Sequence, residues 1–310
     1  MKKPIESLKN FNNIIITSFM GIGNTINLIP LAEYFKKQNK KVVFLVWNRG
    51  AGEIIQNNKF IYKIIMIPTK KSIIQNLLFT LNLKKKINPK KTLFIVSYPH
   101  GPRREKFISK IYNAKKTIFI NRKKQAHDVI TNIYKFNKNI KYKRPIIFFS
   151  KKEKNFKENF LKQNKISKKD FVIGIHPGCN PQNIKKRLPK KEYIKIIINQ
   201  VKTQNKIFLF LGPDELNMDS FFRERLKEHL YKEVFIINEK LLRNSAVLMS
   251  RCNKYLGNDS GLMHVAEAVG VKDIKAFFLT NLEIAFRNYP LGKKENAILD
   301  VQEFLKKFSK

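Results

Sequence analysis

Residues 254–269 read KYLGNDSGLMHVAEAV, and this stretch carries the pattern that decides the fold. Its start, Lys254–Leu256, is predicted to form a strand, and Met263–Val269 has the spacing of a buried helix. Between them, Asp259 or Ser260 is a candidate N-cap, and Gly261 lets the main chain approach a ligand. The free N–H groups at such a helix start favour a bound diphosphate. His264, one turn inside the helix, either binds a phosphate or is a core histidine.

The same alternation of short apolar runs and amphipathic stretches extends along the chain and is typical of a βαβ protein. The runs are apolar on both faces, as strands covered by helices must be. In the first half we expect strands over Asn13–Phe19, Val42–Trp47, Ile64–Ile67, Leu93–Ser97 and Thr117–Ile120, with helices over Thr25–Gln38, Ser72–Lys86 and Ala126–Phe136. In the second half we expect further strands over Phe171–His176, Ile207–Leu211, Val234–Ile237 and Ile274–Phe278, with helices over Lys190–Gln204, Met218–Leu230 and Leu241–Ser250. A lysine-rich connection over Lys138–Asp170, helical around Lys152–Lys165, separates the halves and predicts two Rossmann-like domains, 1–150 and 151–310.

Composition excludes several classes of protein. The 310 residues are 43% hydrophobic and 28% charged, which is typical of a globular chain and not of a fibrous or disordered one. The sequence contains no apolar run of about 18 residues, so no membrane-spanning helix is expected. No apolar h-region follows the first lysines, so a secretory signal is not expected either. Two cysteines, Cys179 and Cys252, cannot build a disulfide framework, so a reducing, cytoplasmic setting is expected.

Basic side chains dominate the charge balance, with 63 Lys and Arg against 23 Asp and Glu and a formal net charge of +40. Such a field attracts polyanions, including anionic lipid and phosphorylated sugars. Heavy use of Lys, Asn and Ile is also what an AT-rich genome produces, and both explanations stay open. Clustered Arg with interleaved aromatic residues is missing, so no specific nucleic-acid partner is expected.

Two further segments lie where predicted strands end. Gly174-Ile-His-Pro-Gly-Cys-Asn180 leads into the basic run Lys185-Lys-Arg-Leu-Pro-Lys-Lys-Glu-Tyr193. Pro189 fits the first turn of a helix, so Lys186 or Arg187 is expected at the carboxyl edge of the sheet, where a cation would neutralise a diphosphate leaving group. A lysine in so basic a chain can equally be plain surface. The second segment, Leu211-Gly-Pro-Asp-Glu215, offers a carboxylate for a ribose diol.

Other chemistry finds little support in the sequence. The segment Phe19-Met-Gly-Ile-Gly-Asn-Thr25 lacks the third glycine of a dinucleotide fingerprint, which disfavours NAD and FAD. There is no P-loop, HExxH or GxSxG motif, and the five histidines are dispersed, so no metal or other cofactor is expected.

Five segments occur in the order seen in glycosyltransferase family 9, the ADP-heptose:lipopolysaccharide heptosyltransferases. They are Gly21-Ile-Gly-Asn-Thr25 with Pro30, His176-Pro-Gly178, Lys186-Arg-Leu-Pro189, Gly212-Pro-Asp-Glu215 and Gly257-Asn-Asp-Ser-Gly261 with His264. The chain resembles this family over about residues 13–280. The resemblance implies an α/β GT-B fold, with an N-terminal acceptor domain and a C-terminal nucleotide-sugar domain facing each other across a cleft. It allows the C-terminal helix to pack back on the N-terminal domain.

The resemblance also implies an inverting, metal-independent transfer of a heptose or similar sugar from a nucleotide sugar, an ADP-sugar by analogy, to a lipopolysaccharide-core or related acceptor. By similarity, Asp259 would contact the donor sugar, and Ser260, Gly261 and Leu262 would hold the diphosphate. Lys186 would stabilise the leaving group and Glu215 would bind the ribose, with Arg187 and His264 as further donor ligands.

One departure from the family concerns the proton. The family has an aspartate as proposed general base where this chain has Asn24, beside Gly23 on the acceptor side, and a carboxamide cannot accept a proton at neutral pH. Another carboxylate could act, and the first 150 residues offer Glu6, Glu33, Glu53, Glu105 and Asp128. Alternatively the leaving phosphate takes the proton, or the chain is a silent nucleotide-sugar or glycan-binding protein.

The acceptor side offers one more cluster. Ser97-Tyr-Pro-His-Gly-Pro-Arg-Arg-Glu105 is expected to be a loop at the cleft edge. Its His100, Arg103 and Arg104 suit an anionic acceptor, because the Arg fork binds phosphate or carboxylate in two places. Glu105 is the first candidate for the missing base and Asp128 the second, while a loop whose arginines only pair with Glu105 is the alternative. The predicted acceptor is a glycolipid, which would place the protein at the inner membrane's anionic surface.

Overall fold

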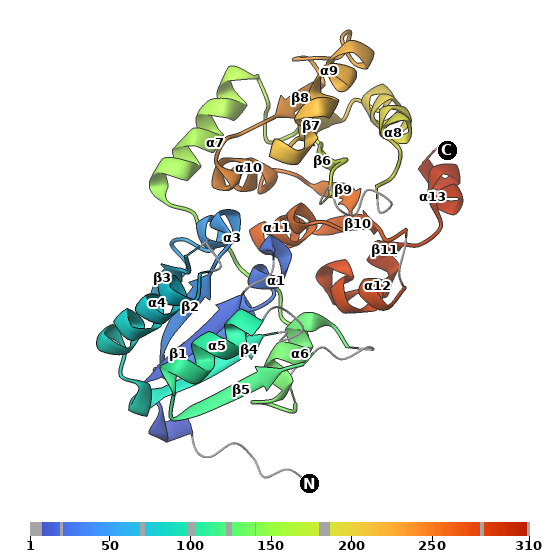
Figure 1. Ribbon diagram of the computed structural model, residues 1–310. Helices are drawn as coiled ribbons and strands as arrows, with labels where there is room; N and C mark the ends of the chain where they lie inside the picture. Colours follow the sequence, from blue (N-terminus) through green and yellow to red (C-terminus); the bar gives the residue numbers. More distant parts are fainter. Residues whose placement is uncertain are drawn as a thin grey trace. The chain divides into compact units, whose positions relative to one another are not determined.

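The computed structural model describes residues 8–18, 21–68, 72–97, 103–121, 126–139, 141–179, 187–279 and 282–308. The chain divides into two compact units, Met1–Phe148 and Phe149–Lys310. Each is built on a sheet whose strand pairings are parallel, and helices connect the strands (Figure 1). The predicted α/β class is therefore confirmed.

The N-terminal unit has a five-stranded sheet in the order β3-β2-β1-β4-β5. Its strands are β1 (Asn13–Ser18), β2 (Lys41–Val46), β3 (Lys63–Met66), β4 (Thr92–Ser97) and β5 (Lys116–Ile120). Its helices are α1 (Ile22–Ile26), α2 (Ile29–Lys36), α3 (Arg49–Ile54), α4 (Ile73–Lys86), α5 (Arg103–Tyr112) and α6 (Asp128–Tyr134). The strand order reverses between β1 and β4, where open α/β sheets bind ligands beyond the carboxyl ends of their strands.

The C-terminal unit has a six-stranded sheet in the order β11-β10-β9-β6-β7-β8. Its strands are β6 (Val172–His176), β7 (Lys206–Phe210), β8 (Val234–Ile237), β9 (Lys254–Asn258), β10 (Asp273–Phe277) and β11 (Ala297–Ile298). Its helices are α7 (Lys151–Gln163), α8 (Lys190–Lys202), α9 (Leu216–Arg225), α10 (Leu242–Met249), α11 (Gly261–Val269), α12 (Leu282–Asn288) and α13 (Val301–Phe308). Here the order reverses between β6 and β9.

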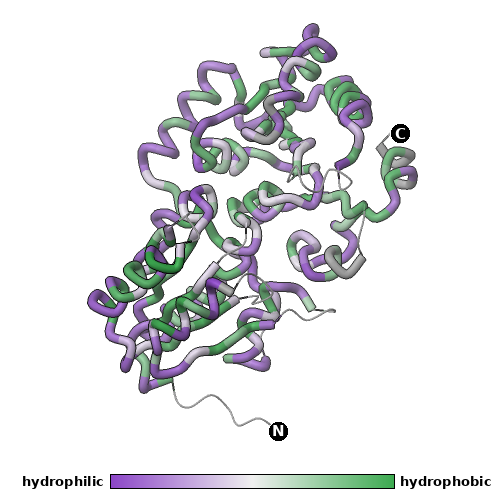
Figure 2. Tube along the Cα trace, in the orientation of Figure 1, coloured by the Kyte–Doolittle hydropathy of each residue, from purple (hydrophilic) through white to green (hydrophobic). Residues whose placement is uncertain are grey.

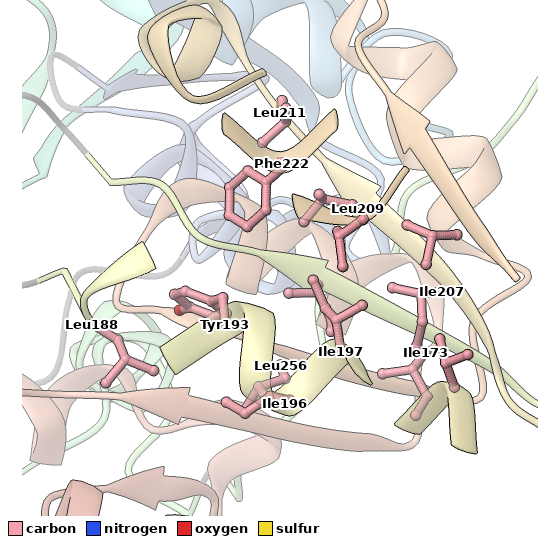
Figure 3. Close-up of a cluster of buried hydrophobic side chains, with 14 of the residues drawn as sticks. Ile173, Leu188, Tyr193, Ile196, Ile197, Ile207, Leu209, Leu211, Phe222 and Leu256 are labelled. Atoms are coloured by element: carbon pink, nitrogen blue, oxygen red, sulfur yellow. The ribbon is translucent and has the colours of Figure 1, made fainter. Parts of the chain in front are cut away.

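A buried apolar cluster fixes α8 on this sheet (Figure 3). Ile196 and Ile197 of α8 belong to the same cluster as strand residues Ile173 and Leu209, and Phe222 of α9 extends it. Full burial of one such side chain contributes about 1.5–3 kcal/mol, so the cluster fixes the position from which α8 begins. Phe304 of α13 joins it through an edge-to-face contact with Phe277, with ring centroids 5.1 Å apart.

Three local expectations were wrong. The helix expected over Thr25–Gln38 is two helices, α1 and α2, because Pro30 has no N–H to donate to an earlier carbonyl and α2 starts afresh just before it. The expected loop ends early, since Arg103–Glu105 form the first turn of α5. Pro189 is the N-cap of α8 and not part of its first turn.

Short helices and late elements went unpredicted. The six-residue α3 contains two glycines, which weaken its helical pattern, and it depends on the Asn48 side chain accepting the Ala51 N–H at 3.0 Å. Helices α12 and α13 and the two-residue β11 were also not predicted. Among the helices that the structure describes, none is both long and apolar enough to cross a membrane.

Candidate active site

The reversal point of the C-terminal sheet gathers most of the residues singled out in the second half of the sequence. Strands β6 and β9 are neighbours there, and His176 at the end of β6 is in register with Gly257 of β9. The loop after β6 carries Pro177 and Gly178, and α11 follows β9 almost at once. The carboxyl edge of this sheet is therefore where a ligand would be bound.

His176 links the two loops. Its Nδ1 lies 3.2 Å from Ser260 Oγ, and its Nε2 lies 3.6 Å from Glu215 Oε2. The imidazole and the carboxylate are both buried. Ser260 is the residue that precedes α11, and its hydroxyl does not cap the helix. The hydroxyl is held by His176 instead, and the start of α11 has no side-chain cap that would compete with an anion.

Glu215, in the turn after β7, contacts both His176 and Arg187. Its carboxylate accepts the Gly212 N–H at 3.0 Å and bonds Arg187 at 3.3 Å. Burial by itself would raise the pKa of Glu215, but His176, the Gly212 N–H and the Arg187 charge together lower that pKa below its usual value. A Cβ on Gly178 would lie 2.0 Å from Glu215 Oε1, so any larger residue there would displace the Glu215 side chain.

Arg187 is held by two acceptors. Its guanidinium donates to the Cys179 carbonyl at 2.6 Å and to Glu215. Its side chain is 10% exposed, and these contacts hold the cation at the carboxyl edge of the sheet, where Lys186 or Arg187 was expected. Lys186 itself lies outside the described residues.

Asn258 was quoted in the sequence motif without a role, and the structure gives it one. Its fully buried amide accepts the Leu188 N–H and the Tyr193 hydroxyl, each at 3.0 Å, and donates to the Pro177 carbonyl at 2.8 Å. One side chain thus joins the loop after β6 to the segment before α8. In the sequence, the signal for this role was the position of Asn258, a polar residue at the end of an apolar strand.

The remaining predicted donor ligands lie just before α11 and in its first turn. Asp259, Gly261 and Leu262 are partly buried around Ser260. His264 is almost fully buried, and burial lowers its pKa to about 4, which the charge of Asp259 partly opposes. The imidazole is therefore neutral at pH 7, and its Nδ1 has no hydrogen-bond partner among the described residues.

The reversal point of the N-terminal sheet brings two segments with predicted acceptor residues, the start of α1 and the start of α5, to one edge. Ser18, at the end of β1, bonds Thr25 of α1, with the two hydroxyl oxygens 2.6 Å apart. This tie fixes the turn of α1 that contains Gly23 and the half-buried Asn24. The neighbouring strand β4 leads to α5, whose first turn contains Glu105.

Glu105 is buried, and neither carboxylate oxygen has a hydrogen-bond partner in the described part of the chain. Burial raises its pKa to about 8. Arg104 does not pair with it: its Nε donates to Asn76 Oδ1 at 2.8 Å, and its Nη2 contacts the Pro68 carbonyl. His100 and the side chain of Arg103 lie outside what the structure describes.

The other carboxylates differ in setting. Glu33 is held by Lys37 and Lys143, and Asp128 is fully buried at the start of α6. Glu53 lies on α3, and Glu6 is outside the described residues. Among the residues with described positions, no group of three His, Cys, Asp or Glu could hold a metal ion.

Comparison with known proteins decides the family. The model of glycosyltransferase family 9 (heptosyltransferase) matches residues 103–310. The chain belongs to glycosyltransferase family 9. The predicted family is thus confirmed, and this family 9 chain is a glycosyltransferase of the heptosyltransferase type.

Relatives of this family 9 chain are distant in sequence. Lipooligosaccharide heptosyltransferase 2 of Campylobacter jejuni is 22% identical over 262 residues, which cover 83% of this chain and 77% of that protein. The crystal structure of a family 9 glycosyl transferase from Veillonella parvula has a TM-score of 0.77 at 20% identity, covering 96% of this chain and 90% of that one. The structure of E. coli ADP-heptose lps heptosyltransferase II has a TM-score of 0.71 at 16% identity, covering 93% and 90%. These likenesses confirm the GT-B fold.

Proposed function

We propose that this family 9 enzyme transfers a heptose or similar sugar from a nucleotide sugar to a lipopolysaccharide-core or related surface-glycan acceptor. The observation that carries the proposal is the cluster of His176, Arg187, Glu215 and Ser260 at the reversal point of the C-terminal sheet, beside the start of α11. An uncapped helix start with a fixed cation is a site for a diphosphate. The names of the Campylobacter and E. coli relatives support a heptose, and that of the E. coli protein supports ADP.

On the donor side, the N–H groups of Ser260, Gly261 and Leu262 would bind the diphosphate, and neutral His264 would contribute a further hydrogen bond. Arg187, with Lys186 from the preceding segment, would balance the charge that develops on the leaving group. Asp259 is the proposed ligand of the sugar. Glu215 stays the proposed ribose ligand, and its contacts support a second task, which is to orient Arg187 and His176.

On the acceptor side, Glu105 is the proposed proton acceptor. The order of the sheet brings the first turns of α1 and α5 to the same edge, so Asn24 could orient the acceptor hydroxyl while Glu105 removes its proton. A buried carboxyl group whose pKa is near 8 is matched to that task close to neutral pH. Gly23, His100, Arg103 and Arg104 remain proposed acceptor contacts, and attack opposite the leaving diphosphate would invert the anomeric centre without a metal ion.

A glycolipid acceptor would require this enzyme to work at the cytoplasmic surface of the inner membrane. The net charge of +40 supports attraction to anionic lipid. Specific nucleic-acid binding is not part of the proposal.

The deciding experiment combines transfer and binding. Purified protein is incubated with ADP-heptose or a panel of UDP- and ADP-sugars and with truncated lipopolysaccharide, and the product is analysed by mass spectrometry and NMR. We expect transfer with inverted anomeric configuration that persists in EDTA. Arg187→Gln should weaken donor binding, whereas Arg225→Gln, an exposed arginine on α9, should not. The proposal would be refuted if no nucleotide sugar gave either turnover or thermal stabilisation.

The binding-only alternative is separated by Asn24→Asp. If wild type binds the donor but never transfers, and the aspartate variant gains transfer, the native chain is a silent binder. If wild type transfers the sugar and Glu105→Gln does not, the result supports Glu105 as the proton acceptor.

A further inference from the structure

Helix α4 buries two polar side chains beside Leu83 and leaves several large apolar side chains exposed, which is unusual for a surface helix. Its most buried positions include Asn76 and Thr80, which are 4% and 0% exposed. Ile73, Ile74 and Leu78 are 71%, 68% and 61% exposed. A helix of a water-soluble domain normally directs its apolar stripe toward the core, so this arrangement calls for a partner on the outside.

The buried polar face has a structural task inside the unit. Asn76 Oδ1 accepts the Arg104 Nε–H at 2.8 Å, and the Thr80 hydroxyl donates to the Asn76 carbonyl at 2.6 Å. The first bond fastens α4 to the first turn of α5, the helix on which it packs, and the second lies within α4. The inward-facing polar residues are therefore satisfied, and they do not explain why the outer face is apolar.

The outer face is continuous and ends in positive charge. At 100° per residue, the side chains of one apolar row fall within an arc of about 140°. The row consists of Ile73, Ile74, Leu77, Leu78 and Leu81. Lys84, Lys85 and Lys86 form the last turn, and Figure 2 shows α4 as hydrophobic along most of its length and hydrophilic at that end. In the sequence, Lys70 and Lys71 come shortly before the helix.

We propose that the outer face of α4 docks on an anionic phospholipid surface, with the aliphatic row inserted at the level of the headgroups and the lysines on lipid phosphates. An interfacial helix combines these two features. Charge complementarity selects this occupant: a second copy of a chain with a net charge of +40 would bring like charges together around the same helix.

This inference deepens the proposed function, because an enzyme that acts on a glycolipid must reach the membrane in which its acceptor is anchored. Docking through α4 would hold the edge that contains α1 and α5 close to the lipid, since α4 is bonded directly to the first turn of α5. The test below contains neither acceptor nor nucleotide, so it can fail while the transfer reaction is confirmed, and the reverse also holds.

Vesicle cosedimentation tests the surface directly. Full-length protein is mixed at physiological salt with vesicles of phosphatidylglycerol and phosphatidylcholine, or of phosphatidylcholine alone. We expect binding to the anionic vesicles only, weakened about tenfold or more in Ile74→Ser/Leu78→Ser. The matched control is Tyr231→Ser/Leu241→Ser, because these C-terminal residues are 69% and 51% exposed. It should bind like wild type, and circular dichroism should show all variants folded.

A charge comparison separates local from diffuse attraction. Lys84→Gln/Lys85→Gln/Lys86→Gln should weaken binding severalfold more than Lys151→Gln/Lys152→Gln/Lys154→Gln, which removes the same charge from α7. The proposal is overturned if wild type ignores anionic vesicles, or if the Ile74→Ser/Leu78→Ser variant binds them as well as wild type. It is also overturned if sedimentation analysis finds a dimer that this variant dissociates, because α4 would then join two copies.

Discussion

Gly178 is the position at which a single methyl group should disable the donor-side cluster. Its Cβ would lie 2.0 Å from Glu215 Oε1, so Gly178→Ala must displace the carboxylate that bonds Arg187 and His176. We expect ADP affinity to fall about tenfold, or ~1.4 kcal/mol, measured by calorimetry. Gly21→Ala is the control, since a Cβ there meets nothing within 4 Å. Unchanged affinity in Gly178→Ala would remove Glu215 from the donor site.

Glu105 should give the reaction a characteristic pH dependence. Burial raises its pKa to about 8, so the carboxylate that can accept a proton becomes the main form only above that pH. We expect kcat to rise with pH up to about 8 and to fall at least a hundredfold in Glu105→Gln at every pH. A wild-type profile that is flat from pH 6 to about 9 would exclude Glu105 as the base.

The same carboxyl group has a consequence for folding that is independent of activity. The native state keeps the proton up to about pH 8, whereas the unfolded chain releases it near the ordinary value of 4.5. Its contribution to stability is thus complete below pH 4.5 and is lost as the pH rises toward 8. Glu267, with a pKa also raised to about 8 by burial, adds a similar slope. In urea unfolding, the free energy of unfolding of Glu105→Gln should therefore fall less steeply with rising pH than that of wild type. It should still fall, because Glu267 remains.

For single residues, the sequence indicates which side chains reach the sheet edge but not which groups they contact there. Ser260, Arg187 and Glu215 were predictable because each follows an apolar strand, and parallel strands end at one edge. That His176 would hold Ser260, or that Asn258 would bind four groups of two segments, depends on distances between loops. Arg104 shows the same limit, because its partners Asn76 and Pro68 lie some thirty residues away along the chain.

Between helices, α7 and α10 are joined by a pair that can be tested. Arg243 contacts Glu153 through two nitrogens, and Glu153 also completes a capping box with Ser150. Glu153→Gln should cost about 2–3 kcal/mol, because it leaves the nearly buried guanidinium without its counter-charge. The control is Glu158→Gln on the same helix, where the side chain is 67% exposed and the expected loss is within about 0.5 kcal/mol.

Acid should weaken this joint in a predictable range. Burial opposes ionisation of Glu153, but Arg243 and Ser150 outweigh it and lower the pKa to about 2. The stability that this pair contributes is present above pH 4.5 and is lost as the pH falls toward 2. Wild type and Glu153→Gln should therefore converge in unfolding free energy at low pH. A gap that stays constant down to pH 2 would show that the cost is steric and not electrostatic.

Elements were predictable to the extent that their burial is uniform. Strands such as Leu93–Ser97 are apolar on both faces, so their position follows from composition alone. Helix boundaries depend on single residues: Pro30 divides α1 from α2, and Asn48 caps an α3 that its glycines conceal. Helix α5 was not predicted, because turn-forming residues directly precede it in the sequence, although Glu105, Ile108 and Tyr112 have helical spacing.

For the molecule as a whole, the division into two units yields the last prediction. Every described member of the donor cluster, from His176 to His264, lies within residues 149–310, which have their own sheet and apolar core. A fragment starting at Phe149 keeps the Ser150 capping box and the contact of Arg243 with the Phe149 ring. We expect this fragment to unfold in one cooperative transition and to bind ADP within about tenfold of the full chain. Arg187→Gln in the fragment should weaken that binding, as is expected for the full chain. A fragment that folds, by circular dichroism and NMR, but does not bind ADP would show that the N-terminal unit supplies part of the donor site.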